Sequence, residues 1–396
     1  MKNTLALYGG TPVRQSILPY GKQWIGEEDI EAVARVLRSD WLTTGPMIQE
    51  FETAFAIVAG TRNAVAVSNG TAALHAITYA VGIKLGDEVI VPSMTFAASA
   101  NCVVYQGATP VFADVDESTL LIDPKSVEER ITEKTRAIIA VDYAGQACDY
   151  PVLREIADEH DLILIADACH ALGGSLNNAP VGSLADISAF SLHPVKHITS
   201  GEGGMVTTDN PLFANKARLF RAHGITTDHR QRESMGSWFY EMVDLGYNYR
   251  ITDFQCALGI SQLKKLMLWI RKRQEIARIY DKAFSGSEYV RPLTVREGVS
   301  HAYHLYVIHL DTEKIGAERN VIFSALRAEG IGVNVHYIPV HMHPFYRTRF
   351  GTGPGLCPSA EHAYESIITI PMYPRMSDGD IQDVITAVLK VTGAFP

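Results

Sequence analysis

Residues 64–115, AVAVSNGTAALHAITYAVGIKLGDEVIVPSMTFAASANCVVYQGATPVFADV, decide the fold class of this chain. Three short apolar runs alternate in this stretch with two segments of helical spacing. The runs lie at 64–67, 88–92 and 109–115, and the helical segments at 72–81 and 97–106. Continuously apolar runs indicate strands that are buried on both faces. Strands that alternate with helices predict an α/β fold with a mostly parallel sheet.

The same alternation continues to about residue 209. Further strands are expected at 137–143, 162–168, 186–192 and 203–209, and further helices at 27–38, 49–59, 124–131 and 151–160. Ligands of such sheets bind at the carboxyl ends of strands. Residues 68–71 and 167–170 both follow a strand directly, so they are the first candidates for a site.

The rest of the chain predicts a second, smaller domain. Residues 252–284 form one uninterrupted helical pattern that turns from apolar to strongly basic. We expect a large domain over 1–260, a bridging helix over 261–284, and a smaller α+β domain over 285–396. In that smaller domain we expect strands at 301–310 and 330–340 and helices at 317–329 and 378–391.

Composition disfavours several classes of protein. The net charge of −9 argues against a nucleic-acid-binding protein, which usually has a basic surface. The sequence contains no run of 18 or more apolar residues, the length that would predict a membrane span. The five cysteines are odd in number and form no CxxC pair, which favours a reducing compartment. The first apolar run is too short for a signal peptide, so we expect a cytoplasmic protein.

A lysine follows a predicted strand in FSLHPVKHITSGEGGM, residues 190–205. Lys196 lies between a proline and a glycine-rich turn. A lysine on a rigid turn suits imine formation if desolvation or a nearby positive charge lowers its pKa from about 10.4. An ordinary surface lysine explains this segment equally well.

An aspartate ends the strand within ADACHALGG, residues 166–174. The carboxylate of Asp167 needs a cationic or hydrogen-bonding partner there, and a protonated pyridine nitrogen would serve. Alone, a capping aspartate is the stronger interpretation. His170 could contact a ring oxygen or cap a helix, and the two interpretations have equal weight.

A third element is VSNGTAALH, residues 67–75, where a Gly-Thr pair opens a helix directly after a strand. Free backbone N–H groups and the helix dipole make an anion site there. Gly70 lets a phosphate approach closely, and Thr71 adds a hydroxyl donor. A plain N-cap turn built on Ser68, Asn69 or Thr71 is the alternative.

Together the three elements supply a phosphate cradle, a carboxylate for a ring nitrogen and an imine-forming lysine, which a pyridoxal phosphate enzyme requires. Phe96 could stack on the pyridine ring or belong to the core. Ser191, five residues before Lys196, could donate to the phosphate. The combination predicts pyridoxal phosphate as cofactor.

With these motifs, the chain resembles the DegT-type family of pyridoxal-phosphate-dependent sugar aminotransferases, of fold type I, over nearly its whole length. The motifs are WLTTGP (41–46), SNGTAAL (68–74), PSMTFAASAN (92–101), ADACHALGG, SLHPVKHITSGEGG (191–204) and GYNYRITDFQCALGISQL (246–263). PYGKQ, SANCVVYQGATPVFADVD and GVNVHYIPVH are more similar to the transaminases of pseudaminic acid synthesis. Those enzymes aminate a UDP-linked 4-keto-6-deoxy-N-acetylhexosamine with L-glutamate as amino donor.

The resemblance implies a role for each cofactor residue. Lys196 would form the imine, Asp167 would bind the pyridinium nitrogen, and His170 would face the ring hydroxyl. Gly70, Thr71 and Ser191 would hold the phosphate, and Asn248 would reach it from the partner subunit of an obligate homodimer. Phe96 stands where many relatives have Trp and should keep the stacking.

The resemblance also implies a substrate site. Arg250 would bind an acidic group of the donor or substrate. The sugar nucleotide would contact Tyr20, Asp40, Trp41, Leu42, Thr43, Ser191, Val335, His336, Tyr337 and Ile338.

Other functions stay open at this point. Sugar dehydratases of this kind replace the active lysine by histidine, whereas here position 196 is Lys and His197 lies one residue off. Amination at ring position 3 or 4 of another nucleotide sugar is an alternative to the UDP-linked substrate. A cofactor-binding sensor is disfavoured, because no DNA-binding domain is appended and the net charge is negative. His336, His341 and His343 lack acidic or Cys partners at zinc spacing, so no metal is expected.

Overall fold

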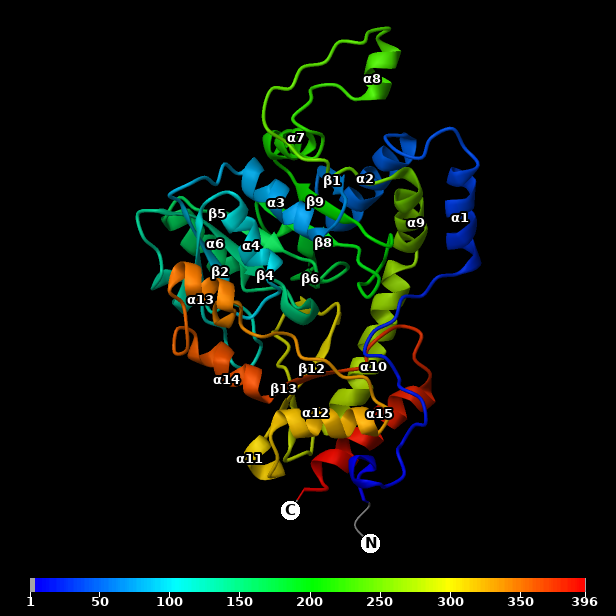
Figure 1. Cartoon of the computed structure of the whole chain (residues 1–396), viewed down its shortest axis with the longest axis vertical. Coiled ribbons are helices and arrows are strands. Elements are labelled where there is room, and N and C mark those ends of the chain that lie inside the picture. The colour runs from blue at the N-terminus through cyan, green and yellow to red at the C-terminus, as the bar shows by residue number, and fades with distance from the viewer. Residues whose placement is uncertain (1–3, 396) are drawn as a thin grey trace.

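The computed structural model describes residues 4–395 and is built around a seven-stranded sheet (Figure 1). In space the strands run in the order β1-β9-β8-β5-β4-β2-β3. Their bounds are β1 Asn63–Val67, β2 Glu88–Pro92, β3 Thr109–Ala113, β4 Thr135–Val141, β5 Ile163–Asp167, β8 Ile187–Ser191 and β9 Gly204–Thr208. β9 pairs antiparallel with β1 and β8, and the remaining pairs are parallel. The predicted α/β fold with a mostly parallel sheet is therefore confirmed.

Helices cover this sheet, and the strands are buried on both faces. The covering helices include α2 Pro46–Ala59, α3 Gly70–Ala80, α4 Ala98–Tyr105, α5 Pro124–Glu128, α6 Tyr150–Glu159 and α7 Pro211–Phe220. Consecutive residues Val89, Ile90 and Val91 of β2 are all fully buried, although their side chains alternate between faces. This explains why the strands appear in the sequence as continuous apolar runs.

A second core lies beside a three-stranded antiparallel sheet. Its strands are β10 Val290–Pro292, β12 Tyr306–Leu310 and β13 Ile367–Ile370, in that order. The helices α12 Arg319–Ala328 and α15 Asp378–Thr392 pack in this core, as do Leu5 and Leu18 from the N-terminal segment. A further small sheet joins β6 Ser175–Leu176 to β7 Ala179–Pro180 and β11 Val299–Ser300.

The expected single helix over 252–284 is wrong. The structure has α9 Asp253–Leu263 and α10 Leu266–Phe284, separated at Lys264–Lys265. Lys265 forms ion pairs there with Glu28 (2.6 Å) and Asp29 (2.8 Å) of α1 Glu27–Leu37. The buried Asp29 also accepts hydrogen bonds from Ser261 and Gln262, so the junction is fixed to α1.

The expected strand at 330–340 is also wrong. Only isolated bridges occur there, between Ile331 and Leu18 and between Asn334 and Thr369. The chain then passes through η4 Val340–Met342, α13 Pro344–Phe350 and α14 Pro358–Ser366, whose buried residues join the core of the large sheet. Figure 1 also shows that the segment carrying α8 His229–Ser234 projects beyond α7.

Candidate active site

The carboxylate of Asp167 lies at the end of β5, near the middle of the large sheet. Ser99 Oγ donates a 2.6 Å hydrogen bond to Oδ2, and the backbone N–H of Cys169 donates to Oδ1 (3.2 Å). Ser99 is in turn 2.7 Å from the hydroxyl of Thr95. These donors hold a buried carboxylate in one orientation at the carboxyl end of a parallel strand.

Lys196 lies in the connection between the neighbouring strands β8 and β9. Burial lowers the pKa of its amine, while the thiol of Cys169 and the carboxylate of Asp167 act in the opposite direction. A lowered pKa raises the fraction of unprotonated amine, the form that attacks an aldehyde. The amine also contacts the side chain of His304, whose Nε2 is 3.4 Å from Nζ.

The glycine at the start of α3 brings three elements into contact. A Cβ on Gly70 would lie 2.9 Å from Cβ of Ser191 and 3.3 Å from Sγ of Cys169. The cradle after β1, the end of β8 and the turn after β5 therefore meet at Gly70. Asn69 caps α3 by accepting from the backbone N–H of Ala72 (2.8 Å), so the N-cap interpretation is correct for Asn69.

His170 lies three residues after Asp167 and is 5% exposed. Its Nε2 is 3.0 Å from the hydroxyl of Tyr337, and its Nδ1 is buried without a partner among the described residues. Burial and the nearby charge of Lys196 keep the pKa of His170 well below its usual value. The imidazole is therefore neutral near pH 7, with one nitrogen left to bind a ligand.

Aromatic side chains form a wall beside His170. The rings of Tyr20 and His336 are 5.4 Å apart, and those of Phe96 and Tyr337 are 5.9 Å apart. His336 is held by Thr369, whose Oγ1 is 2.8 Å from Nδ1, and by Tyr143, whose hydroxyl donates to the His336 carbonyl. Val335 is half-buried, whereas Ile338 and Phe96 are more exposed.

These residues fit pyridoxal phosphate. The first turn of α3 offers backbone N–H groups to a phosphate, and because Gly70 has no Cβ the phosphate can approach this turn closely, with Thr71 half-buried beside it. Asp167 supplies an oriented carboxylate for a ring nitrogen, and the free Nδ1 of His170 suits a ring oxygen. The donor set contains every group that the cofactor needs from one chain.

The remaining predicted residues form a group around the start of α9. Thr43 pairs with Thr252, and Asp253 donates its N–H to the carbonyl of Leu42 (3.0 Å). The carbonyl of Tyr249 accepts from the N–H of Ser68 (2.9 Å), which places the flanking residues Asn248 and Arg250 next to the cradle turn. Asn248 itself is exposed, as is Asp40.

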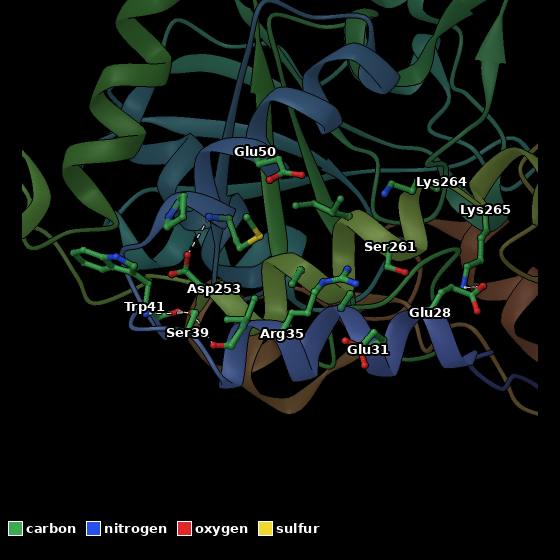
Figure 2. A pocket seen from close by; sticks show the side chains of 16 residues that line it. Glu28, Glu31, Arg35, Ser39, Trp41, Glu50, Asp253, Ser261, Lys264 and Lys265 are labelled. Atoms are coloured by element: carbon green, nitrogen blue, oxygen red, sulfur yellow. Dashed lines mark hydrogen bonds and ion pairs between the residues drawn. The ribbon is translucent and has the colours of Figure 1, made fainter.

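A groove of about 750 Å³ lies elsewhere, between α1, the start of α2 and the junction of α9 with α10 (Figure 2). Ser39 and Trp41 lie at one end, and Glu28 and Lys265 at the other. Its lining includes none of the cofactor residues named above. Trp41 also lies under the guanidinium of Arg230, 5.8 Å from the ring centre.

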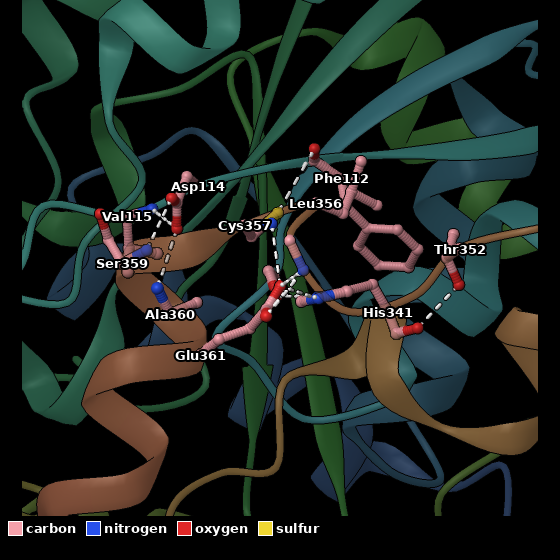
Figure 3. A network of polar contacts seen from close by, with 12 residues as sticks. Phe112, Asp114, Val115, His341, Thr352, Leu356, Cys357, Ser359, Ala360 and Glu361 are labelled. Carbon is pink, nitrogen blue, oxygen red and sulfur yellow. Dashed lines mark hydrogen bonds and ion pairs between the residues drawn. The ribbon is translucent and has the colours of Figure 1, made fainter.

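Two of the three histidines of VHYIPVHMHP, His336 and His341, form hydrogen bonds with other side chains. Nδ1 of His341 is 2.6 Å from Ser93 Oγ. Its Nε2 is 2.9 Å from Glu361 Oε1 (Figure 3). Glu361 also accepts from the N–H groups of Gly355 and Cys357. We call this set, Ser93, His341 and Glu361, the clasp, because it joins the loop after β2 to α14. Within residues 4–395 no group of three or more His, Cys, Asp or Glu side chains is placed to hold a metal ion.

Sequence reasoning missed several residues of the site. Ser99 and His304 both touch a predicted catalytic side chain, and Tyr143 and Thr369 hold the aromatic wall. Ser99 lies four residues after Thr95, whose hydroxyl it contacts, within the quoted motif PSMTFAASAN. The sequence around His304 gives no indication of this role, because His304 and Lys196 are 108 residues apart in the chain and come into contact only in the folded protein.

Comparison with known proteins identifies the family. Residues 23–389 match the DegT/DnrJ/EryC1/StrS aminotransferase family. The chain is 42% identical over 380 residues to the spore coat polysaccharide biosynthesis protein SpsC of Bacillus subtilis, and the aligned region covers 96% of this chain and 98% of that protein.

No helix among the residues described is long and apolar enough to cross a bilayer.

Two solved structures are similar over nearly the whole chain. One is PseC of Helicobacter pylori, an aminotransferase involved in the biosynthesis of pseudoaminic acid, with 32% identity, a TM-score of 0.90 and coverage of 96% and 100% of the two chains. The other is the putative sugar aminotransferase Spr1654 of Streptococcus pneumoniae in its PMP form, with 33% identity, a TM-score of 0.89 and coverage of 95% and 99%. The chain thus belongs to the DegT/DnrJ/EryC1/StrS aminotransferase family, and it is a sugar aminotransferase of fold type I that uses pyridoxal phosphate.

Proposed function

We propose that this chain transfers an amino group from L-glutamate to a nucleotide-linked 4-keto-6-deoxy sugar, with UDP-4-keto-6-deoxy-N-acetylhexosamine as the first choice of acceptor. The observation that carries the proposal is the meeting of Lys196, Asp167 and the Gly70 cradle at the ends of β8, β5 and β1. Similarity to PseC supports the acceptor. A structural neighbour, DesI, was solved with a TDP-sugar product. The alternative acceptor is therefore a dTDP-linked keto sugar, which would receive the amino group at ring position 3 or 4.

The residues of the chain divide the work of binding. Gly70, Thr71 and Ser191 would hold the phosphate of the cofactor, and Asp167 would face its ring nitrogen. His170 would donate from Nδ1 to a ring oxygen. When bound, the cofactor supplies an aldehyde that captures amines and a ring that withdraws electrons from the adjacent carbon.

Lys196 has two tasks in this proposal. Its amine would hold the cofactor covalently at rest, and once free it would hold and move the proton at the reacting carbon. Burial lowers the pKa of the amine, which favours both tasks near neutral pH. A sugar dehydratase is the runner-up activity, and a lysine at position 196 speaks against it.

The part of the wall formed by Tyr20, His336 and Tyr337 suits the sugar nucleotide, because aromatic faces stack on sugar and base rings and their polar ends bind hydroxyls. Phe96, beside Tyr337, is assigned to the pyridine ring of the cofactor. We assign Ser191, Val335, Ile338 and the segment 40–43 to the same ligand. The guanidinium of Arg250 is assigned to the carboxylate of glutamate, since arginine binds carboxylates in a bidentate manner.

We also propose a homodimer with shared active sites in the cytoplasm. The segment that carries α8 and projects beyond α7 is unusually apolar for a surface, and the side chain of Trp238 in it is 84% exposed. Its other exposed apolar side chains are Met235, Phe239, Tyr240, Met242, Val243 and Leu245. Asn248 follows this segment and is exposed, so it is free to reach a partner's cofactor. All five cysteines are free, which supports a reducing compartment.

The test is incubation of the holoenzyme with glutamate and a panel of UDP- and dTDP-linked keto sugars. NMR of the product gives the ring position and the configuration of the new amine, and 2-oxoglutarate is measured in parallel. Lys196→Ala should abolish turnover. Normal turnover by Lys196→Ala, or loss of a sugar hydroxyl without 2-oxoglutarate, would show that the proposed function is wrong.

A further inference from the structure

His304 contacts the amine of Lys196 and has no part in the function proposed above. It is 5% exposed and precedes β12 of the small sheet, whereas Lys196 follows β8 of the large one. The 3.4 Å contact between Nε2 and Nζ therefore joins the two sheets at the reacting atom.

The backbone around His304 is fixed on both sides. The buried guanidinium of Arg273 donates to the carbonyls of Tyr303 (3.0 Å) and His304 (3.3 Å). The N–H of Leu305 donates to the carbonyl of Ala144 (3.1 Å). Gly145 has φ +109°, and a Cβ there would lie 2.9 Å from the nitrogen of His304. The imidazole is thus delivered to Lys196 by a rigid backbone.

The two ring nitrogens of His304 are used unequally. When the amine of Lys196 is protonated it only donates, so in that state Nε2 of His304 carries the lone pair and Nδ1 the proton. Nδ1 is buried without a partner among the described residues. An unpaired buried N–H lowers stability, and a phenylalanine would fill similar space without that loss. Because the unpaired imidazole of His304 does not stabilise the fold, we expect it to have a functional role.

The electrostatic surroundings of the amine leave room for such a role. The other ionisable groups near it are Asp167, Cys169, His170, His197 and His336. Burial holds the pKa values of these histidines below the usual range, and the same holds for His304. The contact therefore joins an amine to a neutral imidazole.

We propose, building on the proposed function, that His304 is a positioning residue for Lys196. Its neutral imidazole accepts a hydrogen bond from the amine whenever the lysine is not bonded to the cofactor. The bond fixes the direction of the amine. It also stabilises the protonated form, which counteracts part of the effect of burial.

The experiment uses the full-length, cofactor-free protein and measures acetylation of Lys196 by acetic anhydride across pH, read from the peptide that contains it by mass spectrometry. In His304→Phe the charged amine loses its acceptor, so the pH of half-maximal reactivity should fall by about one unit and the rate below it should rise about tenfold. His304→Gln keeps a hydrogen-bond acceptor, so its pH of half-maximal reactivity should lie close to that of the unsubstituted protein. His309→Phe is the matched control, because this buried histidine of β12 also has an unpartnered nitrogen but contacts Ser366.

Coincident profiles for His304→Phe and the unsubstituted protein would overturn the proposal. Equal shifts in the Phe and Gln variants would overturn it too, because packing alone would then explain them. Should the Phe variant fail to fold, His304→Leu gives the same comparison. Lysine acetylation needs neither cofactor nor substrate, so an absence of transamination would count against the proposed function and leave this test standing.

Discussion

The hydroxyl of Ser99 and the carboxylate of Asp167 are joined by a 2.6 Å hydrogen bond between two buried side chains. Ser99 comes from α4 and Asp167 from the end of β5, so a helix fixes the rotamer of a strand residue that faces the proposed ring nitrogen.

Removal of this donor should weaken both the fold and the cofactor site. Ser99→Ala leaves one buried carboxylate oxygen without its hydroxyl partner, which should lower the free energy of unfolding by about 1–3 kcal/mol. The affinity for pyridoxal phosphate should fall as well, because the carboxylate is free to turn. Urea unfolding and a fluorescence titration with the cofactor measure the two effects. Ser324→Ala, at an exposed position on α12, should change neither.

The Gly70 cradle should not tolerate a methyl group. In Gly70→Ala the new Cβ would lie 2.9 Å from Cβ of Ser191, so we expect weaker cofactor binding and a loss of about 1–3 kcal/mol in stability from overpacking. Adding Ser191→Gly should recover part of the stability, because it removes the atom that is struck. Gly379→Ala is the control, since its nearest neighbour is the Ser377 hydroxyl at 3.7 Å. An unaltered cofactor affinity in Gly70→Ala would contradict the cradle.

The clasp should stabilise the segment that follows the aromatic wall. Glu361→Ala removes the partner of His341 Nε2 and the acceptor of the N–H groups of Gly355 and Cys357. We expect a loss of about 1–3 kcal/mol and faster proteolysis between 342 and 357. Glu365→Ala, an exposed site on the same helix, should behave like the unsubstituted protein. Equal proteolysis rates for the two variants would exclude this role.

The stability of the protein should fall in mild acid. Burial lowers the pKa values of His75 and His309 to about 4 and that of His336 to about 3. As the pH falls from about 6.5 towards 4, the unfolded chain takes up protons that the folded chain refuses. Each histidine then costs up to about 1.4 kcal/mol per pH unit. Urea unfolding of the cofactor-free protein at pH 7, 5.5 and 4.5 tests this. His75→Phe should flatten the dependence, and an unchanged slope would contradict the assignment.

The main elements of the site could be predicted because each follows a strand of a parallel sheet. Asp167, Ser191 and Gly70 lie near the ends of β5, β8 and β1, and the sheet topology alone brings them together. His304 could not be predicted, because its contact with Lys196 depends on how the two sheets pack. The expected helix over 252–284 is divided at Lys265 by ion pairs with α1, a tertiary effect that helical periodicity does not contain.

The strand expected at 330–340 is absent for a related reason. β13 already pairs with β12, and on its other side Thr369 forms only one bridge, with Asn334. Without a ladder the segment keeps only this bridge and the one between Ile331 and Leu18. An apolar pattern gives the propensity of a segment, but ladder partners decide whether it becomes a strand.

Lys196 sits in the connection between two strands that pair directly with each other in the interior of the large sheet. Release of that connection by local fraying would require the separation of β8 from β9, which are both buried. A molecule attached at Lys196 is therefore tethered to two buried strands in the interior of the large sheet. On heating, the yellow colour of the attached cofactor and the native circular dichroism should disappear in the same transition.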